Sequence, residues 1–396
     1  MILFLMFLAA LNIVDRYYFC IYIAGALFLL TPNRKLRFNS SVTMLLLFGI
    51  AILLFNPSSQ TTVLNMLKPF SFVLCYMMGY GLFRNKYSEE QTLLKEEKNV
   101  SSVMYILAGG TLLHFLLNMM VNLASESRTE LIDFWTKSEM AATVQATLAC
   151  LTVGVAIAFL FSKVGLRKKL VALGAIGLIV AYNLILAGRT LFLFIIITAV
   201  VAFLYLCVAQ RRKNTKLVAV LMVVFLILTL AYSADAFGIK TTVESSNFYL
   251  RFFGDSGTQE LDDDKRLEYK LVYIERFFDH MWGGGHIRKS YGYYAHDLYL
   301  DTYDDAGIFA LLTIVAYITS SLLRLWKCIR SKQISLQMRM LVLCTYVVCN
   351  MQFWLEPIIL GVPWLLACYC FMDGAVSYLL LRAKETPAKG QAAVNH

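Results

Sequence analysis

Long apolar segments separated by short polar stretches run through almost the whole chain. The expected segments cover residues 1–14, 17–31, 41–55, 64–83, 100–123, 140–161, 169–187, 191–209, 216–233, 305–326, 340–356 and 359–381. Most have the length of about 20 residues that a helix needs to cross a hydrocarbon layer of roughly 30 Å. The apolar positions do not alternate with polar ones, as they do in the strands of a membrane barrel. The sequence therefore predicts an all-α fold, a polytopic membrane helical bundle with about 12 transmembrane helices.

The composition agrees with this pattern. The chain has 396 residues, of which 59% are hydrophobic and only 16% are charged, and its mean hydropathy is +0.64. Soluble domains are about 45–50% apolar. A water-soluble globular protein is therefore excluded as a class.

The net charge of +10 is distributed by side of the membrane rather than gathered for nucleic acid. When the loops are assigned alternately to two sides, one side holds most of the lysines and arginines, and the other holds most of the acidic residues. The positive-inside rule then places both termini in the cytoplasm and the longest polar insert outside. The lipid bilayer is the partner that this distribution implies, and nucleic acid is not.

Four regions follow from the segments. Residues 1–233 form an N-terminal transmembrane bundle of about nine helices, and residues 234–304 form a long extracytoplasmic loop, expected to be catalytic. Residues 305–382 form C-terminal transmembrane helices, and residues 383–396 form a disordered cytoplasmic tail rich in Lys, Ala, Gly and Pro. The two halves do not repeat each other, which counts against an inverted-repeat transporter. None of the nine cysteines falls in the insert, so they are expected to be packing residues without an external disulfide framework.

An arginine stands between two apolar segments in the sequence Leu186-Ala187-Gly188-Arg189-Thr190-Leu191. Its expected place is at or just below the outer surface of the membrane. An arginine at membrane depth is costly unless it pairs or reaches water. Two interpretations stay open for Arg189. It is either a turn residue that extends to the surface or a clamp for an anionic group.

The insert contains an expected amphipathic helix. Its apolar stripe consists of Leu267, Leu271, Ile274, Phe278 and Met281, at helical spacing. Asp262–Asp264 are placed to cap its beginning, and Gly283–Gly285 are placed to end it. Such a helix lies on the membrane face or over the bundle. Arg266, in its first turn, is either a surface charge or an anion-binding residue.

His296 precedes the segment that starts near Asp305, and on a helix it would share a face with Leu300 and Tyr303. A neutral imidazole can take a proton from a hydroxyl near neutral pH, although a structural histidine is the alternative. Asp279, His280, His286 and His296 lack the spacing of a metal motif, so no metal and no cofactor are expected. His114, inside an apolar segment, is expected to be buried and hydrogen-bonded, and Glu356-Pro357 is expected to end a helix.

These stretches together resemble the O-antigen polymerase/ligase superfamily, which contains Wzy polymerases and lipopolysaccharide O-antigen ligases. Members carry a Gly-Ser-Arg-Thr-like step, which Ala187-Gly188-Arg189-Thr190 is similar to. They also carry an exported arginine-led helix with a Gly-rich turn, which Arg266 to Gly285 resembles, and a closing His-Asn-x-x-Leu before an acidic residue and Gly. His296-Asp297-Leu298-Tyr299-Leu300 with Asp305 and Gly307 resembles the last motif. Asp297 replaces the usual Asn, which leaves its role open, and Asp305 replaces the usual Glu.

The resemblance implies a membrane glycosyltransferase that polymerises undecaprenyl-diphosphate-linked oligosaccharides into O-antigen, capsule or exopolysaccharide, in a bacterial cell membrane and without metal. Arg189 and Arg266 would then stabilise the diphosphate leaving group, and His296 would act as general base in an inverting transfer. A flippase and a chain-length regulator are implied partners. Further candidates for substrate binding are Arg251, Arg276, Arg288, Lys289, Tyr294 and Asp297.

Two other functions stay open. An O-antigen-type ligase would transfer finished polymer to a lipid or wall acceptor and would need the same charges. A transporter or flippase of the lipid-linked sugar belongs to another class. It would favour ionisable residues at the middle of the bilayer and pseudo-symmetric halves. This chain instead concentrates such residues in one external insert.

Overall fold

The computed structural model describes residues 1–31, 38–55, 66–84, 92–123, 130–186, 188–210, 233–235, 239–244 and 265–385. The expected segment at 216–233 falls almost entirely outside the described residues. Residues 236–238 and 245–264 of the 234–304 insert and the tail beyond residue 385 fall outside them as well. The bounds of the insert therefore stay a prediction. The disorder of the C-terminal tail also stays a prediction, except at residues 383–385, which are helical.

The first half of the described chain is a series of helices. They are α1 (Ile2–Ala10), the 3-10 turn η1 (Ile13–Asp15), α2 (Tyr17–Leu30), α3 (Ser40–Phe55), α5 (Phe70–Gly81), α6 (Leu93–Asn122), α7 (Ala142–Phe161), α8 (Leu166–Ile185) and α9 (Arg189–Gln210). The second half contains α11 (Ile239–Glu244), α14 (Lys265–Glu275), α15 (His286–Tyr291), α16 (Leu298–Arg330), α17 (Leu336–Phe353), α18 (Ile358–Gly361) and α19 (Pro363–Glu385). Among the described residues, β pairing is limited to one isolated antiparallel bridge between Ile132 and Glu139.

Among the described residues, six helices are long and apolar enough to cross a membrane, namely α6, α7, α8, α9, α16 and α19. The all-helical, multi-pass membrane character predicted from the sequence is therefore confirmed. The expected count of about twelve crossings is not confirmed. Helices α2, α3 and α5 have 14, 16 and 12 residues, which is shorter than a full crossing of the bilayer.

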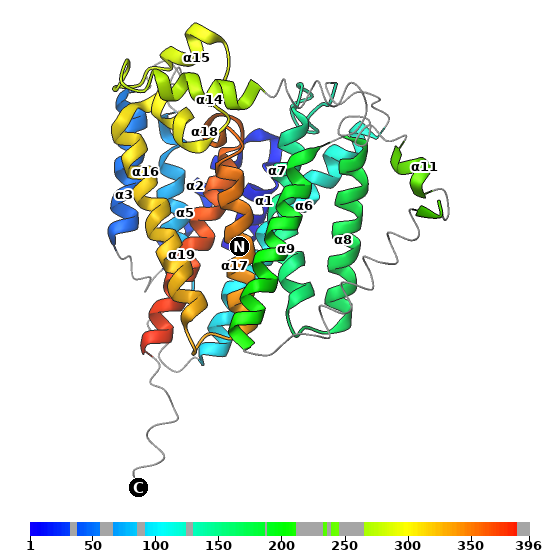
Figure 1. Ribbon diagram of the computed structural model, residues 1–396. Coiled ribbons are helices and arrows are strands. Elements are labelled where there is room, and N and C mark those ends of the chain that lie inside the picture. The colour runs from blue at the N-terminus through cyan, green and yellow to red at the C-terminus, as the bar shows by residue number, and fades with distance from the viewer. Residues whose placement is uncertain are drawn as a thin grey trace.

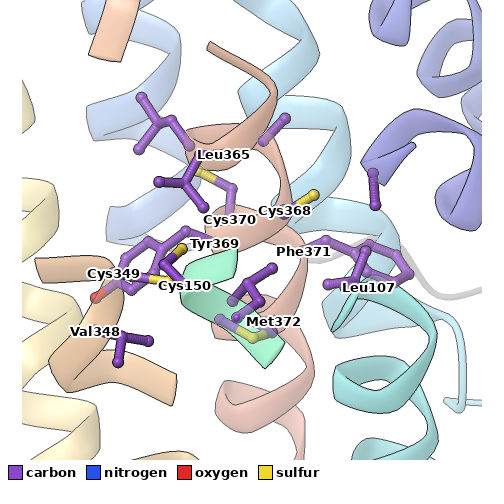
Figure 2. Packing of buried hydrophobic residues seen from close by; sticks show 14 of the residues in the cluster. Leu107, Cys150, Val348, Cys349, Leu365, Cys368, Tyr369, Cys370, Phe371 and Met372 are labelled. Atoms are coloured by element: carbon purple, nitrogen blue, oxygen red, sulfur yellow. The ribbon is translucent and has the colours of Figure 1, made fainter. Parts of the chain in front are cut away.

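The centre of the bundle is formed by α7, α17 and α19, and the outer helices are more exposed. Helix α19 packs against α5, α17 against α7, and α16 against α3. Figure 2 shows the apolar contacts at this centre, where Cys150, Cys349, Cys368 and Cys370 lie among Leu, Val and Phe side chains. All nine cysteines are free, as expected for packing residues.

Two glycines let α5 and α19 approach each other closely. A Cβ atom added to Gly79 would overlap the carbonyl of Phe371, and one added to Gly374 would overlap the carbonyl of Tyr76. Small residues at such crossings are the common way in which membrane helices pack, because lipid offers no hydrophobic drive between them. This contact fixes the two helices at the middle of the bundle.

A polar face of α6 holds the loop before α7. His114, Asn118 and Asn122 follow one another at intervals of four residues, so they lie on one side of the helix. Asn122 pairs with the backbone of Ile132, Asn118 accepts from the Phe134 N–H, and His114 Nε2 lies 3.1 Å from Asp133 Oδ2. The expected buried, hydrogen-bonded role of His114 is confirmed.

Helices α14 and α15 lie across one end of the bundle, where α9 and α16 both begin (Figure 1). Helix α14 starts at Lys265, so Arg266 is in its first turn as predicted. The helix is shorter than expected, because it ends at Glu275 and residues 276–282 form turns. Asp262–Asp264, which were expected to cap it, lie outside the described residues.

Candidate functional site

Helix α14 brings Arg266 to the connection between α17 and α18. The guanidinium Nη1 lies 3.8 Å from Glu356 Oε1 and 3.5 Å from the carbonyl oxygen of Leu355. Glu356 is almost fully buried. The helix expected to end at Glu356-Pro357 ends slightly earlier, at Phe353, and α18 begins at Ile358. Burial raises the pKa of Glu356 to about 7, although Arg266 acts in the opposite direction.

Lys270 lies one turn after Arg266 and links the same helix to the beginning of α16. Its Nζ donates to the carbonyl oxygen of Trp354 at 2.7 Å and lies 3.4 Å from Asp297 Oδ2. Two cations at i and i+4 on one helix thus face two buried carboxylates from separate parts of the chain. Neither the contact of Lys270 nor a role for Glu356 in the site is predicted from the sequence. The spacing of Lys270 after Arg266 was the available signal.

Asp297 is the N-cap of α16. Its carboxylate accepts from the backbone N–H groups of Tyr299 at 2.9 Å and Leu300 at 2.6 Å. Burial raises the pKa of Asp297, against the effects of the Leu300 N–H and of Lys270. The role left open by the departure from Asn is therefore structural at least in part, since Asp and Asn both cap helices well.

His296 lies just before this cap and is not on the helix, so the predicted shared face with Leu300 and Tyr303 is wrong. Its backbone φ is 56°, in the left-handed region that few non-glycine residues adopt. Asp301 stabilises the turn by accepting from the N–H groups of Ala295 at 2.8 Å and Asp297 at 3.1 Å. A buried carboxylate thus fixes the backbone on both sides of the half-buried imidazole.

A second cluster lies on the other side of His296. The ring of Tyr294 is centred 6.3 Å from that of His296, and Arg288 Cζ lies 5.4 Å from the centre of the Tyr294 ring. Arg288 Nη1 also lies 2.8 Å from Asp305 Oδ1. The charge of Arg288 is therefore compensated within the protein, at a shorter distance than the 3.8 Å that separates Arg266 from Glu356.

The glycine run locks the insert onto a break in α16. Gly307 has φ 76° and ψ −176°, and a Cβ atom there would come within 2.7 Å of the Met281 carbonyl oxygen. A Cβ atom on Gly283 would lie 2.6 Å from the Gly307 nitrogen. Gly284 and Gly285 donate to the carbonyls of Asp305 and Asp304 at 3.0 and 2.8 Å. The prediction that Gly283–Gly285 end the amphipathic helix is therefore wrong, because α14 already ends at Glu275 and the glycine run docks on α16.

The remaining candidates are dispersed. Arg276 is exposed and pairs with Asp279 at 3.1 Å, and Lys289 donates to the carbonyl oxygen of Gly284 at 2.7 Å. Arg251 and the side chain of Arg189 lie outside the described residues. Arg189 begins α9 at the end of the bundle where α14 lies (Figure 1), so its convergence with Arg266 and His296 stays a prediction.

The described parts of the chain contain no group of three or more His, Cys, Asp or Glu residues that could hold a metal ion. His280 and His286 instead stack on each other, with ring centres 4.3 Å apart. No protein-family model matches the chain, and a search of curated proteins finds no match to it.

Proposed function

We propose that the protein is a membrane glycosyltransferase that polymerises undecaprenyl-diphosphate-linked oligosaccharides at the outer face of a bacterial cell membrane. The observation that carries the proposal is the contact of Lys270 with Asp297, the residue after His296, while Arg266 lies one turn before Lys270 on the same helix. Cations next to a candidate base, at one end of a bundle of membrane helices, fit a lipid-linked phosphate substrate. The family resemblance supplies the class of sugar donor.

Stabilising the leaving group requires positive charge at the membrane surface. When the anomeric carbon separates from the diphosphate, negative charge grows on the phosphate oxygens, and Arg266 and Lys270 offset it electrostatically. An arriving diphosphate would also favour the neutral form of Glu356, because like charges raise the pKa of a carboxyl. Protonation of Glu356 would then remove one negative charge from beside Arg266.

His296 would act on the acceptor. The acceptor hydroxyl oxygen bonds to the anomeric carbon as the bond from that carbon to the diphosphate oxygen breaks, and undecaprenyl diphosphate leaves. The hydroxyl proton passes to the imidazole of His296, which is the general base of this inverting displacement. The hydrogen bonds of Asp301 around the turn hold His296 in place before the substrate arrives.

The apolar stripe of α14 supports a location at the membrane surface. Leu267, Leu271 and Ile274 are all more than two-fifths exposed, although their helix also carries Arg266 and Lys270. Exposed apolar side chains on an amphipathic helix insert into the headgroup region of a membrane. Helix α14 would then bring its two cations to the depth at which a lipid diphosphate lies.

The banding of surface polysaccharide in a deletion strain tests the function. We expect the strain to show single repeat units without a polymer ladder, and the wild-type gene to restore the ladder. Accumulation of lipid-linked polymer would instead indicate a ligase, and loss of all outward-facing repeat units would indicate a flippase. Either outcome would contradict the polymerase assignment.

A further inference from the structure

A cavity of about 660 Å³ is lined mainly by residues from the last turns of α16 and α19. These helix ends lie at the end of the bundle opposite α14 and α15 (Figure 1). Arg324, Lys327 and Arg330 line it from α16, and Lys384 lines it from the last turn of α19. The residues that line it include no carboxylate. Four cations around one cavity form a site for an anionic group.

One of the four cations is already compensated. Arg324 Nε donates to Asp373 Oδ1 at 2.9 Å, and its Nη2 donates to the other carboxylate oxygen at 2.5 Å. Its Nη1 donates to the hydroxyls of Ser41 and Ser320, each at 2.8 Å. Arg324 thus forms the satisfied inner wall of the cavity and is not its main anion ligand.

Lys327, Arg330 and Lys384 differ from Arg324 in this respect. Within the described part of the chain, none of the three forms an ion pair with a carboxylate, and all three are exposed. The Arg330 guanidinium lies 4.5 Å from the centre of the Trp326 ring, which orients it by a cation–π contact. Their charges are therefore available to a ligand.

Part of the cavity wall is suited to hydrocarbon. Leu380, Leu381 and Ala383 line the cavity from α19, and Trp326 lines it from α16, where Trp326 and the neighbouring Leu323 are about half exposed. Polar side chains of Asn39, Ser331 and Ser377 also line the cavity. A free anion would use the cations but not the apolar wall, whereas a lipid with a charged headgroup would use both.

We propose that this cavity binds the phosphate headgroup of an anionic membrane lipid, with Lys327, Arg330 and Lys384 on the phosphate and the acyl chains along α19. Basic pockets between membrane helices are suited to such headgroups, because charge and apolar contact meet at one depth. The site is separate from the proposed glycosyl transfer site, which lies at the other end of α16.

The test is a titration of the detergent-purified full chain with phosphatidylglycerol and, in parallel, with phosphatidylcholine, followed by native mass spectrometry. We expect phosphatidylglycerol to bind more tightly. The triple variant Lys327→Gln, Arg330→Gln and Lys384→Gln should bind phosphatidylglycerol at least about tenfold more weakly. Lys384→Gln alone, at an exposed helix end, should lose about fivefold, which keeps the test informative if the triple variant unfolds on heating.

The matched control replaces Lys163, Arg167 and Lys169 with glutamine, two lysines and one arginine before and within the first turn of α8, outside the cavity. Its affinity for phosphatidylglycerol should not change. An equal loss in both triple variants would overturn the proposal, because it would show a general surface-charge effect. Retained affinity in the cavity variant, or displacement of the lipid by glycerol 3-phosphate alone, would also overturn it.

Discussion

Arg266 Nη1 lies 3.8 Å from Glu356 Oε1, and this ion pair joins the first turn of α14 to the connection between α17 and α18. The carboxylate is nearly inaccessible, whereas about a third of the arginine side chain is exposed. The buried acid therefore depends on an accessible cation for its charged form. A ligand that competes for Arg266 will also change the protonation of Glu356.

The raised pKa of Glu356 predicts how stability depends on pH. The fold favours the protonated form, so the contribution of Glu356 is fully present below its ordinary value of 4.5 and is lost as pH rises through about 7. Glu356→Gln stays neutral at every pH and should therefore remove this dependence, which amounts to up to ~3 kcal/mol in the free energy of unfolding. Thermal unfolding in detergent between about pH 5 and 7 measures it. Glu268→Gln, at an exposed position on α14, should change nothing. Parallel pH curves for wild type and Glu356→Gln would contradict the assignment.

The two roles of Asp297 can be separated by substitution. Asp297→Asn keeps a capping side chain and should retain the stability of α16, whereas Asp297→Ala should lose about 1 kcal/mol. Thermal unfolding compares the two variants. If Asn and Ala destabilise the protein equally, the contact with Lys270 rather than the cap is the main contribution of this residue.

The break in α16 requires glycine at position 307. Gly307→Ala combines a positive φ with overlap against Met281 and Trp282, so it should destabilise the protein by more than about 2 kcal/mol. Gly292→Ala is the matched control, because Gly292 also has a positive φ but open space around it, and it should cost only about 1 kcal/mol. Equal melting temperatures for the two variants would show that the insert does not dock on α16 as described.

The proposed chemistry relies on arginine and lysine charges, so a chelator should leave activity unchanged. The check is the rate of polymer formation by purified protein with and without EDTA. A rate that falls in EDTA and returns with a divalent ion would contradict a mechanism that uses protein cations alone.

Hydropathy predicted the apolar core of most helices but not where the helices begin. Helix α3 covers Ser40–Phe55, close to the expected 41–55, because its ends coincide with the ends of the apolar segment. Helix α6 starts at Leu93, although the expected segment starts at residue 100. Hydropathy misses the first turns of this helix because they are charged. Glu96 accepts from Tyr378 and Glu97 accepts from the Ser335 N–H, so buried partners far along the chain stabilise these turns. One sequence does not reveal such partners.

In the candidate site, too, local positions were predictable from the sequence but contacts between distant residues were not. The positions of Arg266 in a helix and of Asp297 at a helix start follow from local patterns. The pairing of Arg266 with Glu356 joins residues far apart in the sequence, and it depends on how α14 crosses the bundle. The left-handed backbone of His296 depends on Asp301, a buried acid that hydropathy alone would place at a solvated helix end.

The most direct test of the proposed function is the rate of glycosyl transfer by the full chain in lipid vesicles, with an undecaprenyl-diphosphate-linked oligosaccharide as donor and acceptor. We predict that Arg266→Ala and His296→Ala each lower the rate at least about a hundredfold. Lys240→Ala, which removes a cation from α11, should retain it. Wild-type rates and chain-length ladders in both site variants would contradict the mechanism.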